Sequence, residues 1–138
     1  MRTLISTGSD FEHVGGYSRA VVQGAFVFVS GTTGYDYTTM TMPDSVEEQV
    51  HNCFKTISAA LNKAGSSLND VVRVNYIITK ASFAELVLPI CGQYFHAIRP
   101  AATMIVAGLI KSEMKIEIEV TAMMMSQMHE LREITGDR

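Results

Sequence analysis

Hydrophobic and polar residues alternate strictly over residues 115–122, near the end of the chain. This period of two predicts a half-buried β-strand, because successive side chains of a strand point to opposite faces of a sheet. The run 103–107 is apolar and partly β-branched, and residues 108–114 form a loop between the two runs, so we expect an antiparallel hairpin. The apolar face would carry Ile116, Ile118, Val120 and Ala122, and the polar face Lys115, Glu117, Glu119 and Thr121.

A helical period begins after Ser45. Ser45 and Glu48 form a capping box, in which the two side chains satisfy free amides of the first turn. Apolar residues follow at helical spacing up to Leu61, and Gly65 marks the end of the helix. An amphipathic helix is therefore expected between Ser45 and Gly65.

A second capping box, from Ser82 to Glu85, predicts another helix. Its sheet-facing side chains would be Leu86, Ile90, Tyr94 and Phe95. Pro89 lies within the segment, and because an interior proline removes a helical hydrogen bond, we expect a kink or a restart of the helix there.

Four further runs predict strands, at residues 2–6, 19–23, 26–30 and 71–79. Gly24 and Ala25 form the tip of a hairpin between the second and third runs, and residues 7–16 form a loop. In the run 71–79, Val72, Val74, Tyr76 and Ile78 would share one face. The order β-β-β-α-β-α-β-β predicts an α+β sandwich with both helices on one face of a sheet.

The methionine-rich end of the chain has two interpretations. Met123 to Met125 extend the last strand, or they join Met128, Leu131 and Ile134 in a short C-terminal helix. No repeat or linker divides the chain, so we expect a single domain over residues 1–124 and a C-terminal extension over residues 125–138.

Charge and composition restrict the function classes. The 138 residues carry a net charge of −3, which offers no basic field for a phosphate backbone, so nucleic-acid binding is not expected. No apolar run is long enough for a membrane span and the N-terminus has no signal-peptide pattern, which favours a cytoplasmic protein. Hydrophobic residues make up 47% of the chain, a balance that fits a subunit of an oligomer.

Cysteine and histidine give no sign of a metal centre. Cys53 and Cys91 occupy apolar positions of the two expected helices, which favours reduced core thiols over a disulfide. The four histidines are scattered without metal-ligand spacing. We expect no metal and no other cofactor.

Three features carry candidate chemistry, each with a structural alternative. Glu117 and Glu119 share one strand face, as a reaction centre or as a solvated surface. The strand exit from Ser30 to Gly34 could cradle a carbonyl or carboxylate, or simply be glycine-rich. Arg73 lies in an apolar strand, where it would form a structural ion pair or serve as a ligand-binding cation.

Five motifs occur in a consistent order: Gly16–Ala20, Val27–Gly31, Ala64–Val72, Arg99–Ala101 and Ile116–Glu119. Together they resemble the Rid family, the YjgF-like reactive intermediate deaminases that are also labelled L-PSP endoribonucleases, over residues 15–124. The resemblance implies a chorismate-mutase-like fold. It also implies a homotrimer whose sheets meet centrally, with small-molecule clefts between subunits.

Deaminating members of that family carry an arginine directly after a Pro-Ala pair, where it binds the substrate carboxylate. The second glutamate of their Glu-x-Glu strand positions or activates water. This chain has Ala102 and Glu119 at those places. A methyl group offers neither charge nor donors, so the standard deamination of 2-imino acids is not expected.

The resemblance makes Glu119 the candidate catalytic residue. The candidate ligand contacts are Tyr17, Ser30, Gly31 and Thr103, and the candidate substitutes for the missing cation are Arg73 and Arg99. The first hypothesis is a deaminase or hydrolase acting on a small imine, enamine or related carbonyl compound. The second is a non-catalytic ligand-binding or regulatory homotrimer, and a third is an enzyme for ring-opened aromatic amines.

Overall fold

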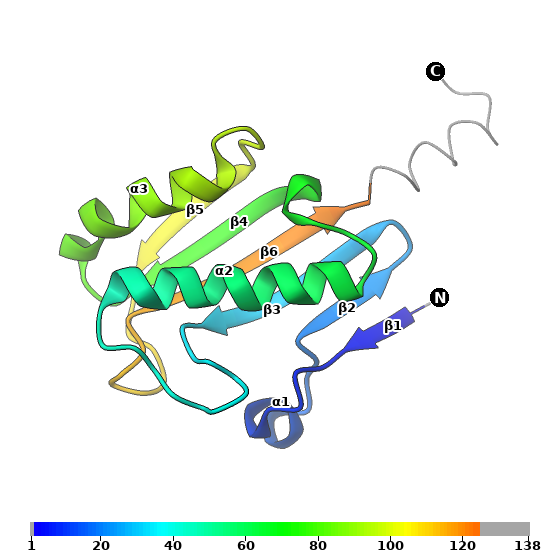
Figure 1. Ribbon diagram of the computed structural model, residues 1–138, viewed down its shortest axis with the longest axis horizontal. Helices are drawn as coiled ribbons and strands as arrows, with labels where there is room; N and C mark the ends of the chain where they lie inside the picture. The colour runs from blue at the N-terminus through cyan, green and yellow to red at the C-terminus, as the bar shows by residue number, and fades with distance from the viewer. Residues whose placement is uncertain (1, 125–138) are drawn as a thin grey trace.

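The computed structural model describes residues 2–124, in which a six-stranded sheet is covered on one face by two long helices (Figure 1). The strands follow the order β1-β2-β3-β6-β4-β5 across the sheet. The elements are β1 (Arg2–Ile5), α1 (Asp10–Gly15), β2 (Ala20–Gln23), β3 (Phe26–Thr33), α2 (Val46–Lys63), β4 (Val71–Ile78), α3 (Ala84–Phe95), β5 (Ala101–Val106) and β6 (Ile116–Met123), with 3-10 turns at Leu68–Asp70 and Ala81–Phe83. The predicted α+β class and the order of its main elements are confirmed.

The predicted hairpin of the last two strands is wrong. β5 pairs in parallel with β4 at the edge of the sheet, and β6 lies between β3 and β4, antiparallel to both. Burial explains the difference: Ile116 and Ile118 are fully buried, whereas the side chains of β5 are mostly exposed. A strand with a buried apolar face is stabilised by two neighbours, while an exposed strand suits an edge.

Helix α2 supplies the centre of the core. The Ser45 hydroxyl accepts a hydrogen bond from the Glu48 amide at 3.1 Å, and the helix ends before Gly65, whose φ of +84° is one that side chains disfavour. Phe54, Ile57 and Leu61 are fully buried against the sheet. The helix predicted from the capping box and the apolar spacing is confirmed.

The segment predicted as a loop over residues 7–16 contains the short helix α1. The Ser9 hydroxyl accepts from the Glu12 amide at 3.4 Å, and Gly16, with a φ of +70°, ends the helix. The sequence carried this signal, because Ser9 and Glu12 have the spacing of a capping box.

The start and the buried face of α3 also differ from the prediction. Ser82 lies in the 3-10 turn Ala81–Phe83, α3 begins at Ala84 without a side-chain cap, and the helix continues through Pro89 without restarting. Leu86 is exposed, and the buried face carries Val87, Ile90, Cys91 and Phe95.

A bulge alters the predicted face of β4. The pairing of β4 with β6 shifts between Val71 and Arg73, so that Val71 is buried and Val72 is exposed. The predicted alternation holds from Arg73 onward, with Val74 buried and Asn75 on the opposite face. That opposite face, which the helices leave uncovered, is called the open face below.

Cys53 and Cys91 are both buried free thiols, as expected for core residues. Burial raises the pKa of the Cys91 thiol to about 11, so it is protonated at neutral pH. Within residues 2–124 no group of potential ligands gathers to hold a metal ion, and none of the helices described there is long and apolar enough to cross a membrane. Met123 extends β6 as one interpretation predicted, whereas the alternative terminal helix lies outside the described residues.

Because β6 is a central strand, we expect that truncating one of its buried side chains lowers the free energy of unfolding substantially. Ile118→Ala should lower the free energy of unfolding by about 2 to 5 kcal/mol, because it removes buried methyl groups and leaves a cavity. Chemical denaturation would measure the loss. Leu88→Ala is the matched control, since Leu88 has the same volume and is half exposed on α3. Equal losses in the two variants would contradict the central position of β6.

Candidate functional site

The open face of the sheet carries a shallow hollow of about 320 Å³ over β3, β4 and β6. Ser30, Arg73, Asn75 and Glu119 line it. Ser30 and Glu119 were predicted as site residues and Arg73 as a substitute cation, and the fold brings all three together. The sequence analysis missed Asn75, because a single asparagine in a strand carries no local signal of its partner.

Asn75 is the direct neighbour of Glu119 across the β4–β6 pair. Its Nδ2 donates a hydrogen bond to Glu119 Oε1 at 2.9 Å. Glu119 is exposed, so this contact orients one carboxylate oxygen while the group stays open to solvent. On its other side Asn75 pairs with Thr103 of β5, so Thr103 lies one strand beyond the hollow.

The remaining predicted residues lie outside the lining of this hollow. Tyr17 is 42% exposed in the segment before β2, and its ring centroid lies 5.9 Å from the Arg19 guanidinium. Arg99 is exposed in the turn after α3, with a φ of +53°. Ala102 is exposed on the edge strand β5, in register with Val74.

Gly31 lies at a register shift of β3, where it contacts the other predicted carboxylate. A Cβ atom added to Gly31 would lie 2.5 Å from Glu117 Oε1, so a larger residue here would force the end of the Glu117 side chain to move. Burial raises the pKa of Glu117, the negative charge of Glu119 raises it further, and Arg19 opposes both effects. Glu117 and Glu119 therefore occupy different environments although they share a strand face.

Arg19 is a second residue that the sequence analysis missed. Its side chain is buried, and Nη1 donates to the Gly31 carbonyl at 2.9 Å and to Thr32 Oγ1 at 3.0 Å. Its guanidinium also lies 4.8 Å from the centroid of the Tyr37 ring. Arg19 thus fixes the end of β3, where Gly31 contacts Glu117.

Glu12 of α1 balances the buried charge of Arg19, with 3.7 Å between Oε2 and Nη2. Burial of Glu12 acts to raise the pKa of its carboxyl, but hydrogen bonds from Thr7, Ser6 and Ser9 and the charge of Arg19 outweigh burial. The pKa of Glu12 is lowered as a result, and the carboxylate is ionised at neutral pH. Glu12, which belongs to the capping box that the sequence analysis missed, is therefore also the ionic partner of Arg19.

The raised pKa of Glu117 predicts a specific dependence of stability on pH. Folding takes up a proton between the ordinary pKa of 4.5 and the higher value in the folded state, so stability falls as pH rises through this window. Glu117→Gln should lack that fall and gain stability relative to the unmodified protein at about pH 8 but not at about pH 4. Chemical denaturation at both pH values measures the difference. An equal gain from Glu85→Gln, which removes an exposed carboxylate on α3, would contradict the assignment.

The "Endoribonuclease L-PSP" family model matches residues 7–124 of this chain. A RutC family protein of Pyrococcus horikoshii is 30% identical over 124 residues, which cover 88% of this chain and 98% of that protein. A protein of Dermatophagoides farinae named 2-iminobutanoate/2-iminopropanoate deaminase is 25% identical over 119 residues, covering 86% of this chain and 93% of its own.

The fold is likewise similar to solved structures. The crystal structure of a YjgF/YER057c/UK114 family member from Mycobacterium tuberculosis superposes with a TM-score of 0.82 at 38% identity. The match covers 89% of this chain and 99% of that one. The resemblance predicted from the five motifs is confirmed.

Proposed function

The chain belongs to the Endoribonuclease L-PSP family, the YjgF-like Rid group, and from that premise we propose that it hydrolyses a small imine or enamine in the hollow on its open face. The observation that carries the proposal is the juxtaposition of Glu119, Asn75, Arg73 and Ser30 in that hollow. The similarity to a protein named as a 2-imino acid deaminase supports this reaction class.

The proposed reaction adds water across a carbon–nitrogen double bond. Glu119 removes a proton from the water as its oxygen bonds to the imine carbon, and it then delivers that proton to the nitrogen. Glu119 next takes the proton of the new hydroxyl group and passes it to the nitrogen as the carbon–nitrogen bond breaks, so that ammonia leaves and a carbonyl compound remains. The hydrogen bond from Asn75 Nδ2 to Oε1 supports this role, because it orients the carboxylate and leaves Oε2 for the water.

Arg73 takes the place of the missing family cation in this proposal. It lies on β4 two residues before Asn75, in the same hollow as Glu119, whereas Ala102 offers only a methyl group on β5. A guanidinium binds carboxylates in a bidentate manner, so Arg73 favours a substrate with an anionic or carbonyl group. Because the cation lies on a different strand, we expect a substrate set that differs from the 2-imino acids of the deaminating relatives.

We also propose that the hollow is completed in a homotrimer. Phe26 and Phe28 of β3 are 39% and 46% exposed and stack with 5.9 Å between ring centroids. Ile105 and Val106 on the edge strand β5 are exposed as well. Apolar surface of this kind is typical of a face that packs against other subunits.

The alternative is a ligand-binding or regulatory protein without turnover. It is favoured by Ala102, which removes the charge that anchors the substrate in the deaminating relatives. Glu119 would then act only as a hydrogen-bond acceptor for the ligand. The two functions share the same hollow and differ in whether Glu119 transfers a proton.

Glu119→Gln separates these functions. It should reduce ammonia release from freshly generated imines by about a hundredfold to ten-thousandfold while ligand binding is retained, because an amide cannot accept the proton from water. A coupled ammonia assay measures turnover, and Glu85→Gln serves as the charge-matched control. Full turnover by the Glu119→Gln variant would exclude a catalytic role for Glu119. If the unmodified protein released no ammonia from any of the imines tested, the binding function would be favoured.

The two candidate cations give a paired prediction. Arg73→Gln should raise the KM for carboxylate-bearing imines by about tenfold or more, because a charged hydrogen bond is lost, whereas Arg99→Gln should leave the KM unchanged. Ala102→Arg should extend activity toward 2-imino acids, since it restores the guanidinium of the deaminating relatives. A rise in KM in Arg99→Gln alone would transfer the anchoring role to Arg99.

A further inference from the structure

A second cavity, of about 620 Å³, opens on the helix side of the sheet. Helix α2 forms one wall, and the end of β1 with its loop and residues 35–38 form the others. Its volume falls within the range of small-molecule pockets, about 300 to 1,000 Å³. It shares none of its lining residues with the hollow on the open face.

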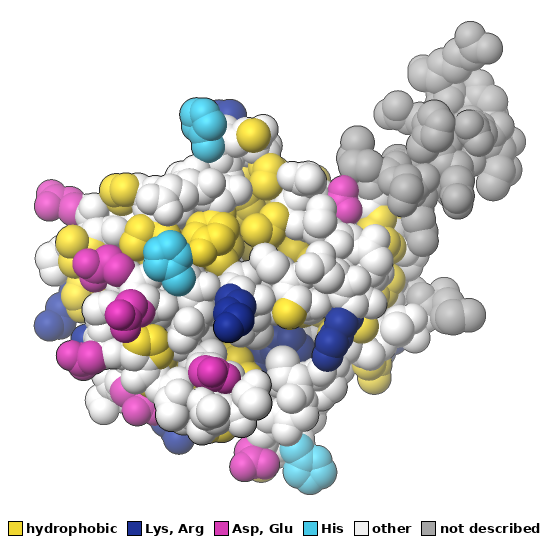
Figure 2. Space-filling model, in the orientation of Figure 1, with side chains coloured by type: hydrophobic (Ala, Val, Ile, Leu, Met, Phe, Trp, Pro, Cys, Tyr) yellow, Lys and Arg dark blue, Asp and Glu magenta, His cyan; other side chains and the backbone are white. Residues whose placement is uncertain are grey.

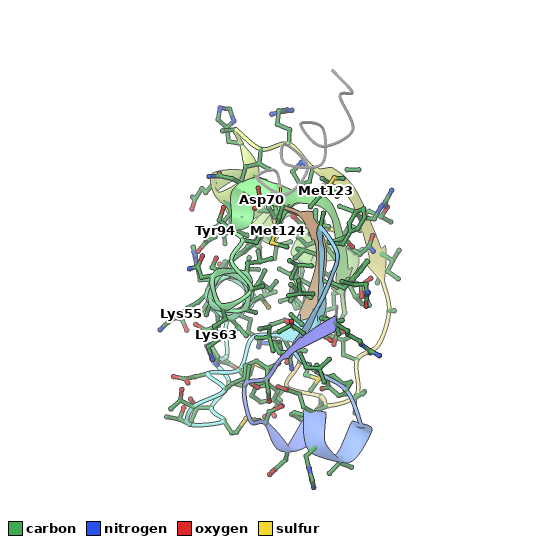
Figure 3. The ribbon with its side chains drawn as sticks, turned by 90° about the vertical axis from the view of Figure 1, so that its right-hand side faces the viewer. Lys55, Lys63, Asp70, Tyr94, Met123 and Met124 are labelled. Atoms are coloured by element: carbon green, nitrogen blue, oxygen red, sulfur yellow. The ribbon has the colours of Figure 1, made fainter. Side chains whose placement is uncertain are left out.

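The lining of this cavity is positively charged. Arg19, Lys55 and Lys63 contribute three cations. Figure 3 shows Lys55 and Lys63 on the same flank of α2, and Figure 2 shows basic side chains near the centre of the helix-covered face, with an acidic side chain below them and most other acidic ones farther to the left. Neither lysine forms an ion pair with another residue in the described part of the chain. The lysines are two helical turns apart, about 12 Å along the axis.

Asp36 is the acidic residue among the cavity walls, and its charge offsets one of the three cations, although it forms no ion pair with either lysine in the described residues. Its Oδ1 accepts hydrogen bonds from the amides of Thr38 at 2.9 Å and Thr39 at 3.4 Å. Asp36 therefore serves to fold its own loop. The cavity retains an excess of positive charge.

Arg19 gives an independent indication of a ligand. It is 1% exposed, and among the described residues its Nε has no hydrogen-bond partner. Glu12 compensates the charge from Nη2, and Gly31 and Thr32 occupy Nη1, which leaves Nε as a buried donor without a partner within residues 2–124, in a residue that lines the cavity. Leaving a buried donor unsatisfied is costly, so an acceptor that reached Nε when a ligand occupies the cavity would stabilise the bound state.

We propose that this cavity binds a small organic anion. Its carboxylate or phosphate groups contact Lys55 and Lys63, and its acceptor atoms approach Arg19. The apolar part of the ligand lies against Ala59 and Tyr37. Two separated lysines suit a molecule with charged groups at more than one point better than a single inorganic ion.

Binding of an anion in this cavity would affect the open face through the contacts of Arg19. The same guanidinium holds the carbonyl of Gly31, which contacts Glu117 and follows Ser30 of the hollow. The anion-binding proposal nevertheless does not rest on the proposed hydrolysis. An anion bound by the lysines needs neither Glu119 nor Arg73.

Isothermal titration of the full chain with AMP and with citrate tests the proposal. At least one of the two should bind saturably, and the double variant Lys55→Gln and Lys63→Gln should weaken that binding by about a hundredfold, or about tenfold for each lost charged hydrogen bond. Stronger binding of AMP identifies phosphate chemistry, and stronger binding of citrate identifies carboxylate chemistry. Glu119→Gln should bind the same anion with unchanged affinity.

Lys80→Gln is the matched control, because Lys80 is an exposed lysine outside both cavities. It should change the affinity by less than about twofold if binding is local. The proposal is overturned if neither anion binds, or if Lys80→Gln weakens binding as much as the double variant does. Because all three lysines are exposed, their replacement leaves the core intact, and circular dichroism of each variant checks this.

Discussion

β6 lies between β3 and β4, and this central position determines both which of its side chains enter the core and which reach the open face. A strand with neighbours on both edges and a helix over one face must bury every second side chain, and Ile116 and Ile118 meet that demand. The intervening residues, Glu117 and Glu119, are thereby fixed on the open face. A slip of one residue would exchange the two faces, so the packing of the core and the placement of the carboxylates are one requirement.

The two carboxylates differ because their neighbours differ. Glu117 packs against Gly31 at the irregular end of β3, where burial and the adjacent charge raise its pKa. Glu119 lies two residues further along, exposed to solvent and hydrogen-bonded by Asn75. Paired acids in unlike environments are suited to unlike roles. Glu119 is open to solvent and held by Asn75, which suits the proton-transfer role proposed for it, whereas Glu117 lies against Gly31 and outside the lining of the hollow.

The features that follow from the local periodicity of the residues were predicted from the sequence. The features that depend on contacts with residues distant in the sequence were missed. The faces of β6 and of α2 follow from periods of two and 3.6 residues. The pairing of β5 with β4 does not, because it depends on helix α3 crossing over the sheet between these two strands. At the candidate site, Glu119 and Ser30 belong to motifs and could be found. Asn75 lies outside the motifs, and Arg19, although it lies within Gly16–Ala20, has a role that depends on contacts with β3 and α1 that no local pattern indicates.

The buried guanidinium of Arg19 shows how one side chain can connect both faces of a sheet. It holds the carbonyl of Gly31 beneath the open face, and it lines the cavity beside α2. Its charge is balanced by a single carboxylate, that of Glu12, at 3.7 Å. Removing an arginine from water costs several kcal/mol of free energy, and one ion-pair partner offsets about that amount. A further acceptor at Nε, the donor without a partner among the described residues, would therefore add stability. An anion that supplied this acceptor would stabilise the end of β3, and with it the contact that keeps Glu117 beside Gly31.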